Sequence, residues 1–210
     1  FSRLHNSLKE GLVAFGHEMV LINNGDGFKN FPSDYSNRAV LCESKLGNIP
    51  RQIIYRITKF DISKIERGIR FYFHLNKLKN FDVVQLINEA PIQTTQKFEL
   101  YLLKKLFNQN NKVFLLCSGV DYMTLNHMLQ KKERYSIMNP YFEEIQEAKE
   151  QYKFMFDYLT KTHEKIHRFL YENIVGVIAT DLDYVNPLKE SPKYIGMIPN
   201  PINLTQMEHK

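Results

Sequence analysis

The sequence of 210 residues contains no tryptophan and only two cysteines, Cys42 and Cys117. Two cysteines are too few for a disulfide scaffold, and their spacing indicates no metal site built on cysteine. Each ends a short apolar run, AVLC or VFLLC, which predicts buried free thiols, with a disulfide between them as the less favoured alternative. No apolar run reaches the roughly 18 residues of a membrane-spanning helix, and no signal peptide is evident. We therefore expect a cytoplasmic protein.

The sequence also lacks the short motifs that mark common nucleotide-binding and hydrolytic sites. It has no G-x-x-x-x-G-K-[ST] loop, no G-x-G-x-x-G fingerprint and no G-x-S-x-G elbow. The nearest approach to a glycine fingerprint, residues 24–27, follows a predicted strand but opens no helix, which indicates a turn. Neither a P-loop NTPase nor a serine nucleophile is implied.

Acidic residues are scarce in one stretch of the chain. Residues 45–79 hold nine Lys or Arg against two acids, a net charge of +7, whereas the whole chain carries +5. Such a stretch indicates an anionic partner, either phosphates or a membrane surface, and the alternative is a solvated helix face. We expect peripheral membrane contact through residues 51–79 and no nucleic-acid partner.

Hydrophobic residues make up 43% of the chain and charged residues 24%, as in an ordinary globular protein. Apolar runs separated by helix-length segments predict an α/β fold, a doubly wound, mostly parallel, Rossmann-like sheet covered on both faces. The predicted strands are 19–22, 39–42, 81–88, 112–117, 175–180 and 194–198. The predicted helices are 2–15, 53–76, 95–107 and 143–171, the last interrupted near Thr160, with loop at 28–37 and loop or broken helices at 118–141.

Ligands of such folds bind beyond the carboxyl ends of the strands. Three polar side chains follow predicted strands: Glu89 in N-E-A-P, Ser118 in C-S-G, and Asp181 after V-I-A-T. We expect them to lie at the ligand-binding edge. The alternative for Glu89 is that it caps the following helical region.

The segment His163-Glu164-Lys165-Ile166-His167 matches H-E-x-x-H. On a helix this spacing places two imidazoles one turn apart, with Glu164 as a general base for a zinc-bound water. However, Lys165 puts a cation between the ligands, and no third ligand follows at a metzincin-like spacing. A zinc hydrolase through His163 and His167 is therefore an alternative, and no metal is the main expectation.

The order of several segments resembles the N-terminal half of GT-B glycosyltransferases. These segments are L-K-E-G-L at 8–12, G-H-E-M-V at 16–20, F-D-V-V-Q at 81–85, I-A-T-D at 178–181 and Y-I-G-M-I-P-N-P-I-N at 194–203. The resemblance covers most of the chain and is greatest to bacterial capsule or surface-polysaccharide transferases of the retaining, glycogen-synthase-like type.

The resemblance implies an acceptor-binding domain over residues 1–203, the start of an interdomain linker at 204–210, and a donor-binding domain that is absent here. It implies a nucleotide sugar as substrate, no cofactor, and a glycan or lipid-linked acceptor. The fragment alone is expected to be inactive, and the alternative is that it serves only as a binding module. The first strand of the family is missing, so the sheet should have an empty edge or centre.

The same resemblance suggests which residues contact substrate. Ser2 and Arg3 would follow the missing glycine-containing loop, near donor phosphate or acceptor. Asp26, Lys29 and Asn30 on the next loop are candidate acceptor contacts. No residue can be matched to a catalytic base. The expected function is therefore sugar transfer in surface-polysaccharide synthesis, with a zinc hydrolase and a non-catalytic α/β module as alternatives.

Overall fold

A computed structural model of the chain describes residues 3–25, 29, 31–131 and 133–201. The chain forms two compact units. Unit 1 comprises residues 1–79, 92–106 and 200–210, and unit 2 comprises residues 80–91 and 107–199. Both contain parallel strands, which confirms the α/β prediction. The described strands form two sheets, however, and not the single sheet that was expected.

Unit 2 is built on a four-stranded parallel sheet in the order β3-β4-β5-β6. The strands are β3 (Val83–Leu86), β4 (Lys112–Cys117), β5 (Gly176–Ala179) and β6 (Tyr194–Met197). All four residues of β5 are buried, as expected for a strand with neighbours on both sides and cover on both faces. All four strands were predicted within two residues at each end.

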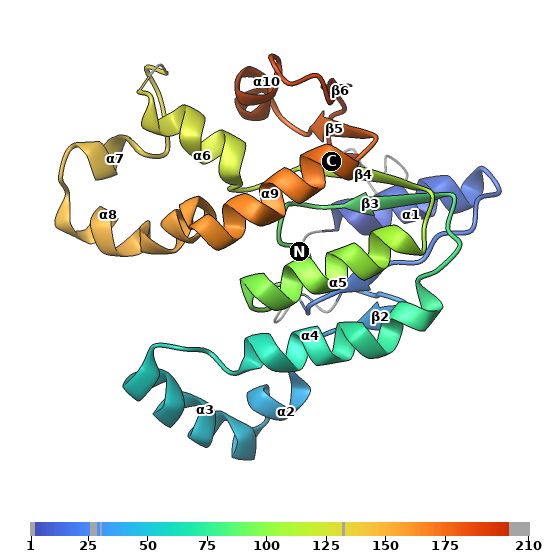
Figure 1. Cartoon of the computed structure of the whole chain (residues 1–210), viewed down its shortest axis with the longest axis horizontal. Coiled ribbons are helices and arrows are strands. Elements are labelled where there is room, and N and C mark those ends of the chain that lie inside the picture. Colours follow the sequence, from blue (N-terminus) through green and yellow to red (C-terminus); the bar gives the residue numbers. More distant parts are fainter. Residues whose placement is uncertain (1–2, 26–28, 30, 132, 202–210) are drawn as a thin grey trace, which may run out of the picture. The chain divides into compact units, whose positions relative to one another are not determined.

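Helices connect these strands, as parallel pairing requires. They are α5 (Gln96–Asn108) before β4, α6 (Tyr122–Leu129), α7 (Asn139–Phe142), α8 (Gln146–Gln151), the 3₁₀ helix η2 (Lys153–Leu159) and α9 (Lys161–Asn173) before β5, and α10 (Leu182–Leu188) before β6. Figure 1 shows α6, α7 and α8 extending beyond the sheet of unit 2. There Leu125, Met138 and Met155 form a small separate core.

A bulge interrupts the pairing of β5 with β6. Val177 pairs with Tyr194 and Ile178 with Gly196, so Ile195 is skipped. Gly196 has a φ of +129°, a backbone conformation that L side chains rarely adopt. The glycine therefore lets the edge strand bend while it remains paired.

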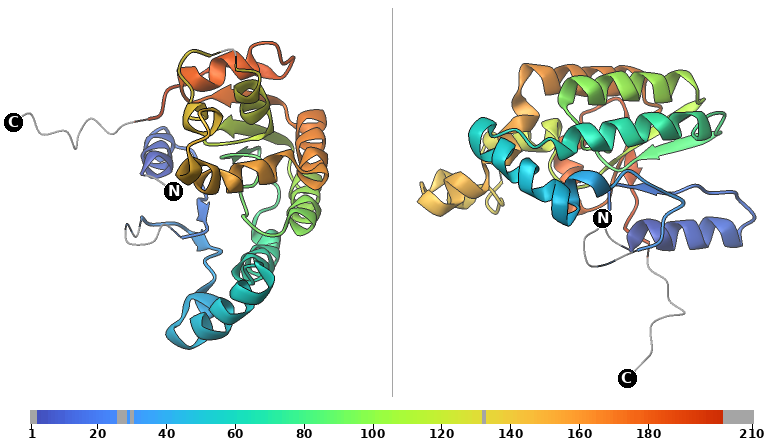
Figure 2. Two further views of the ribbon diagram at one scale, coloured as in Figure 1. Left: turned by 90° about the vertical axis from the view of Figure 1, so that its left-hand side faces the viewer. Right: turned by 90° about the horizontal axis from the view of Figure 1, so that it is seen from below.

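Unit 1 contains a two-stranded parallel sheet and the whole basic stretch, residues 45–79. Its elements are α1 (Leu4–Ala14), β1 (Ile22–Asn23), β2 (Tyr35–Ser36), α2 (Val40–Glu43), α3 (Lys45–Thr58), α4 (Ser63–His74) and the 3₁₀ helix η1 (Leu75–Lys77). Figure 2 shows α4 running beside α5. A side chain at Gly68 would place its Cβ 2.5 Å from the ring of Phe98, so a glycine permits this close helix packing.

Several predicted elements of unit 1 were wrong. Residues 39–42 are not a strand, because Val40–Glu43 is a helix. The predicted helix 53–76 is two helices, since Lys59 takes a left-handed conformation with φ of +58° and ends α3. The predicted strand 19–22 is reduced to the pair Ile22–Asn23, and residues 28–37 include the short strand β2.

Both cysteines are free thiols, so the disulfide alternative is wrong. Cys117 is buried at the end of β4 as predicted, whereas Cys42 lies half-buried on α2. Within the described part of the chain, no helix combines the length and the apolar character that crossing a membrane requires. The predicted linker at 204–210 lies outside the described residues.

Candidate functional site

The ends of three parallel strands in unit 2 meet at one edge, here called the carboxyl edge. Glu89 follows β3, Ser118 follows β4, and Thr180 and Asp181 follow β5. The hydroxyl of Thr180 donates a 2.8 Å hydrogen bond to the carbonyl of Cys117, which ties the ends of β4 and β5 together. The predicted position of these polar residues after the strands is confirmed, and their contact with a ligand stays a prediction.

Glu89 is the centre of a buried polar cluster at this edge. Its side chain is fully buried. Its Oε2 lies 2.8 Å from Nε2 of His163, and its Oε1 lies 2.6 Å from Nδ1 of His167. The backbone N–H of Tyr122, the first residue of α6, donates to Oε2 at 3.1 Å. Glu89, His163 and His167 are called the Glu–His cluster below.

The start of α9 brings both histidines to Glu89. Thr160 is the N-cap of this helix, and its hydroxyl accepts the backbone N–H of His163. A spacing of four residues places His163 and His167 on one helix face. Ile166 and Leu170, which are fully buried, continue that inward side. The predicted interruption near Thr160 is thus confirmed, and it sets the position of both imidazoles.

Aromatic rings hold the two imidazoles in place. The ring of Tyr122 stacks on His167 with centroids 4.4 Å apart, and Tyr171 lies 4.4 Å from the same imidazole. The ring of Tyr158 packs edge-on against His163 at 4.6 Å. With a hydrogen bond on one side and rings on the faces, the imidazole of His167 has little freedom to rotate.

The electrostatics of the cluster assign its protons. Burial raises the pKa of Glu89, but hydrogen bonds from His163 and His167 more than offset this and hold the pKa below its usual range. Glu89 is therefore ionised at neutral pH and only accepts hydrogen bonds. Nδ1 of His167 must then carry the hydrogen that faces Glu89. In its neutral form His167 consequently has Nε2 free as an acceptor.

A second carboxyl group lies beside the cluster. Asp121 is the N-cap of α6, with its carboxylate accepting the backbone N–H of Thr124 at 2.8 Å and the thiol of Cys117 at 2.7 Å. Burial, and next the charge of Glu89, raise the pKa of Asp121 to about 6. Burial also raises the pKa of the Cys117 thiol, which is therefore a protonated donor and not a nucleophile.

A pocket of about 380 Å³ adjoins the cluster. His167 is the one member of the cluster that lines it, and the other lining residues are Tyr122, Glu164, Arg168, Tyr171 and Glu172. The hydroxyl of Tyr171 is buried and has no hydrogen-bond partner among the described residues. The pocket thus combines an imidazole acceptor, a guanidinium donor and a phenol, which suits a ligand with several hydroxyl groups.

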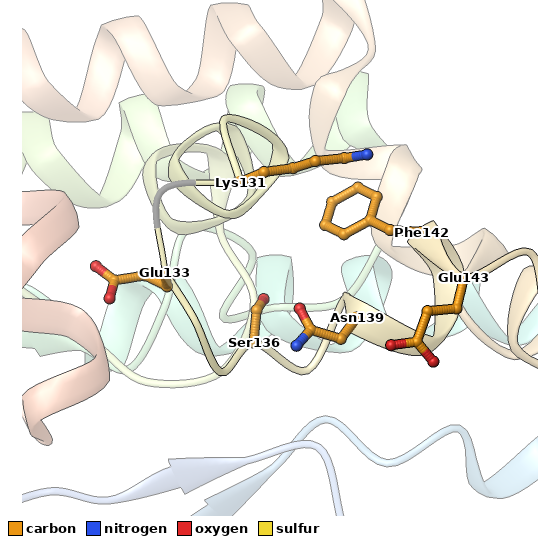
Figure 3. A pocket seen from close by; sticks show the side chains of 6 residues that line it. All are labelled: Lys131, Glu133, Ser136, Asn139, Phe142 and Glu143. Carbon is orange, nitrogen blue, oxygen red and sulfur yellow. The ribbon is translucent and has the colours of Figure 1, made fainter.

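A smaller hollow of about 210 Å³ lies near α7. Figure 3 shows Lys131 extended over the ring of Phe142, and its Nζ is 4.4 Å from the ring centroid. The other lining residues are Glu133, Ser136, Asn139 and Glu143, none of which is buried. This hollow therefore offers less organised chemistry than the Glu–His cluster.

The H-E-x-x-H residues have other partners than the zinc alternative requires. Both imidazoles bond to Glu89, and Glu164 forms an ion pair of 2.9 Å with Arg168. Within residues 3–25, 29, 31–131 and 133–201, no group of three or more His, Cys, Asp or Glu side chains is arranged to hold a metal ion.

The predicted site residues fall in different places. Glu89 lies at the carboxyl edge but is fully buried, and its carboxylate bonds to the two histidines. It also serves as a cap, although for α6 and not for the helix that follows it in sequence. Ser118 is half-buried, and Asp181 is exposed and caps α10 by accepting the backbone N–H of Leu182 at 2.6 Å.

The remaining predicted contacts lie in unit 1 or are not described. Arg3 is exposed and lies 3.7 Å from Glu10, and Lys29 is exposed. Ser2, Asp26 and Asn30 lie outside the described residues. Sequence reasoning gave no role to Tyr122 and Tyr171, because no local pattern marks an aromatic residue that packs on a histidine.

No protein-family model matches this chain, and comparisons with curated proteins and with solved structures give no match either.

Proposed function

We propose that this chain is the acceptor-side domain of a GT-B glycosyltransferase, which transfers a sugar from a nucleotide sugar to a glycan or lipid-linked acceptor. The observation that carries the proposal is the pocket at the carboxyl edge of a parallel sheet, where Glu89 presents Nε2 of His167. The order of the sequence segments, ending in I-P-N-P after β6, supports the same assignment.

The proposed role of the pocket is to bind the acceptor. Hydroxyl groups of the acceptor would donate to Nε2 of His167 and accept from Arg168. They would also accept from the Tyr171 hydroxyl, which would thereby gain a hydrogen-bond partner. In the transfer, the bond from the anomeric carbon to the diphosphate oxygen breaks, and a bond to an acceptor oxygen forms. The acceptor hydroxyl gives its proton to the departing nucleoside diphosphate, which leaves.

We further propose that the donor binds to a separate domain. The chain alone would then bind glycans without turning over a nucleotide sugar. Ser118, Asp181, Arg3 and Lys29 remain proposed substrate contacts on this basis. The retaining stereochemistry and the role in surface-polysaccharide synthesis rest on the sequence resemblance alone.

Nuclear magnetic resonance of the imidazole groups tests the proposal. A panel of bacterial surface oligosaccharides is titrated into the chain, followed by uridine diphosphate glucose. We expect at least one oligosaccharide to shift the His167 resonances in a saturable way, whereas the nucleotide sugar leaves them unchanged. Arg168→Ala should weaken oligosaccharide binding roughly tenfold, the loss of about one charge-assisted hydrogen bond.

The exposed residue Phe154 provides the control, because Phe154→Glu adds charge in unit 2 outside the residues that line the pocket. Its oligosaccharide binding should equal that of the wild type. Absence of binding across the panel, or binding untouched by Arg168→Ala, contradicts the proposed site. Stoichiometric zinc that is lost in both His163→Ala and His167→Ala would instead favour the hydrolase alternative.

A further inference from the structure

Helix α3 has an apolar stripe that the protein does not bury. None of its 14 residues is buried. Leu46, Ile49, Ile53 and Ile57 follow the three-and-four spacing of one helix face, and their exposed fractions are 85%, 62%, 54% and 78%. An amphipathic helix of a globular protein normally packs such a stripe on the core. Here the stripe is left open.

Polar contacts and close backbone packing hold α3 in place without the stripe. Arg51 makes two hydrogen bonds to the carboxylate of Asp61, at 2.7 and 2.6 Å, which tie α3 to the start of α4. A Cβ at Gly47 would lie 1.9 Å from the carbonyl oxygen of Leu41, so α2 packs directly on the backbone of α3. Figure 2 shows α3 at the outside of unit 1.

The structure around α2 and α4 is fixed by charge as well. Glu66 on α4 accepts the backbone N–H groups of Leu41 and Cys42 at 2.9 and 2.8 Å. These bonds contribute to a pKa for Glu66 of about 2, although burial acts in the opposite direction. Hydrogen bonds therefore connect α2 and α3 to α4, and the stripe lies on the outer side of this group of helices.

The charges flanking the stripe are positive and available. No acidic residue occurs in α3. Lys45, Arg56, Lys59 and Lys64 make no ion pair with any described residue. By contrast, Arg67 pairs with Glu43 and Arg70 with Glu66. Four cations without an ion pair therefore lie on α3 or shortly after it.

We propose that α3 docks unit 1 on an anionic lipid surface. The stripe would enter the boundary between head groups and acyl chains, while Lys45, Arg56, Lys59 and Lys64 contact lipid phosphates. Charge complementarity favours lipid over a second copy of this chain, whose α3 would bring the same positive charges. This inference goes beyond the proposed function and does not depend on it.

Vesicle sedimentation tests the docking. The chain is mixed at low salt with phosphatidylcholine vesicles, with or without phosphatidylglycerol. We expect binding that requires phosphatidylglycerol and weakens as salt is added. Ile53→Glu should weaken it at least tenfold, and the double change Lys45→Glu with Arg56→Glu roughly thirtyfold. Because α3 buries no residue, these variants should fold.

Matched controls come from η2. Phe154→Glu and Lys153→Glu change an exposed apolar and an exposed basic residue there, and both should leave vesicle binding unchanged. No sedimentation at low salt, or equal sedimentation of the α3 variants, overturns the proposal. A wild-type dimer that Ile53→Glu dissociates, without vesicle binding, would overturn it in favour of self-association. Glycan binding at His167 is measured separately, so either proposal can fail alone.

Discussion

Two glutamate side chains, Glu89 in unit 2 and Glu99 in unit 1, are buried to the same degree but held in opposite ways. Their exposed fractions are 0% and 1%. Glu89 bonds to two imidazoles, and its pKa lies below its usual range. Glu99 accepts the backbone N–H groups of Ile92 and Thr94, at 2.8 and 2.9 Å. Burial, only partly opposed by these bonds, raises its pKa to about 7.

The difference shows that the partners, and not burial alone, decide the state of a buried carboxyl group. Backbone amides bring dipoles but no net charge, whereas imidazoles can bring both. Glu99 consequently holds the backbone of the segment before α5 by accepting its N–H groups. Glu89 instead accepts hydrogen bonds from two imidazole side chains, and one of these, His167, lines a pocket.

Removing Glu89 should have the largest effect on stability. Glu89→Ala would leave two imidazoles and the N–H of Tyr122 without their acceptor. We expect the free energy of unfolding to fall by about 3–5 kcal/mol, because three buried donors lose their acceptor. Urea denaturation followed by circular dichroism measures it. The exposed Glu172 on α9, the helix that carries both histidines, is the control, since Glu172→Ala should change stability by less than about 0.5 kcal/mol. A similar small change in Glu89→Ala would contradict the ionised cluster.

The two glutamates should contribute pH dependences of opposite sign to the free energy of unfolding. Because folding raises the pKa of Glu99 from 4.5 to about 7, the folded state holds an extra proton, and stability falls as pH rises through this range. The loss is roughly 3 kcal/mol. Folding lowers the pKa of Glu89, so its contribution is present above 4.5 and is lost as pH falls further.

Two glutamine variants check this contrast by urea denaturation across pH. Glu99→Gln should flatten the decline between pH 4.5 and about 7, whereas Glu89→Gln should flatten the decline at lower pH. If Glu89→Gln leaves the decline below pH 4.5 unaltered, the contrast between the two carboxyl groups is wrong.

The charge of Glu89 should also be visible at Asp121. It contributes, after burial, to a pKa of about 6 for that carboxyl group. In Glu89→Gln, the pKa of Asp121 should move down toward its ordinary value, as measured by carbon NMR of the side chain. In Glu99→Gln it should not move. An unchanged Asp121 titration in Glu89→Gln would mean that Glu89 is not charged in the wild type.

The smallest effect is expected for Tyr171→Phe, which should raise the stability of the protein but weaken its binding of oligosaccharide. Its hydroxyl is buried without a partner, so Tyr171→Phe should stabilise the protein by up to about 1 kcal/mol. If the hydroxyl bonds a ligand in the pocket, the same variant should bind oligosaccharide several times more weakly. Thermal unfolding and NMR titration give the two readings. Unaltered binding would remove Tyr171 from the proposed site.

The sequence predicted the sheet of unit 2 better than the elements of unit 1. The run V-G-V-I-A around β5 is continuous and apolar because β5 is buried on both faces, and V-F-L-L-C in β4 because that strand is buried on one face and half-buried on the other. The run at 39–42 has similar letters, but Val40–Glu43 forms α2, and the N–H groups of Leu41 and Cys42 bond to Glu66, 25 and 24 residues further along. A contact at that distance leaves no local pattern.

The Glu–His cluster was predictable only in pieces. Glu89 was expected at the carboxyl edge, and the i, i+4 spacing placed His163 and His167 on one helix face. Nothing local connects them, since they lie 74 and 78 residues from Glu89 along the chain. The histidines therefore suggested zinc, while the structure gives them a shared carboxylate.

The most direct test of the Glu–His cluster is the protonation pattern of the His167 ring, read by nitrogen NMR of the histidine-labelled chain at neutral pH. We predict hydrogen on Nδ1, bonded to Glu89, and an Nε2 resonance that moves when an oligosaccharide binds in the pocket. Hydrogen on Nε2 with a bare Nδ1 would contradict an ionised Glu89, and with it the proposed presentation of His167 to a ligand.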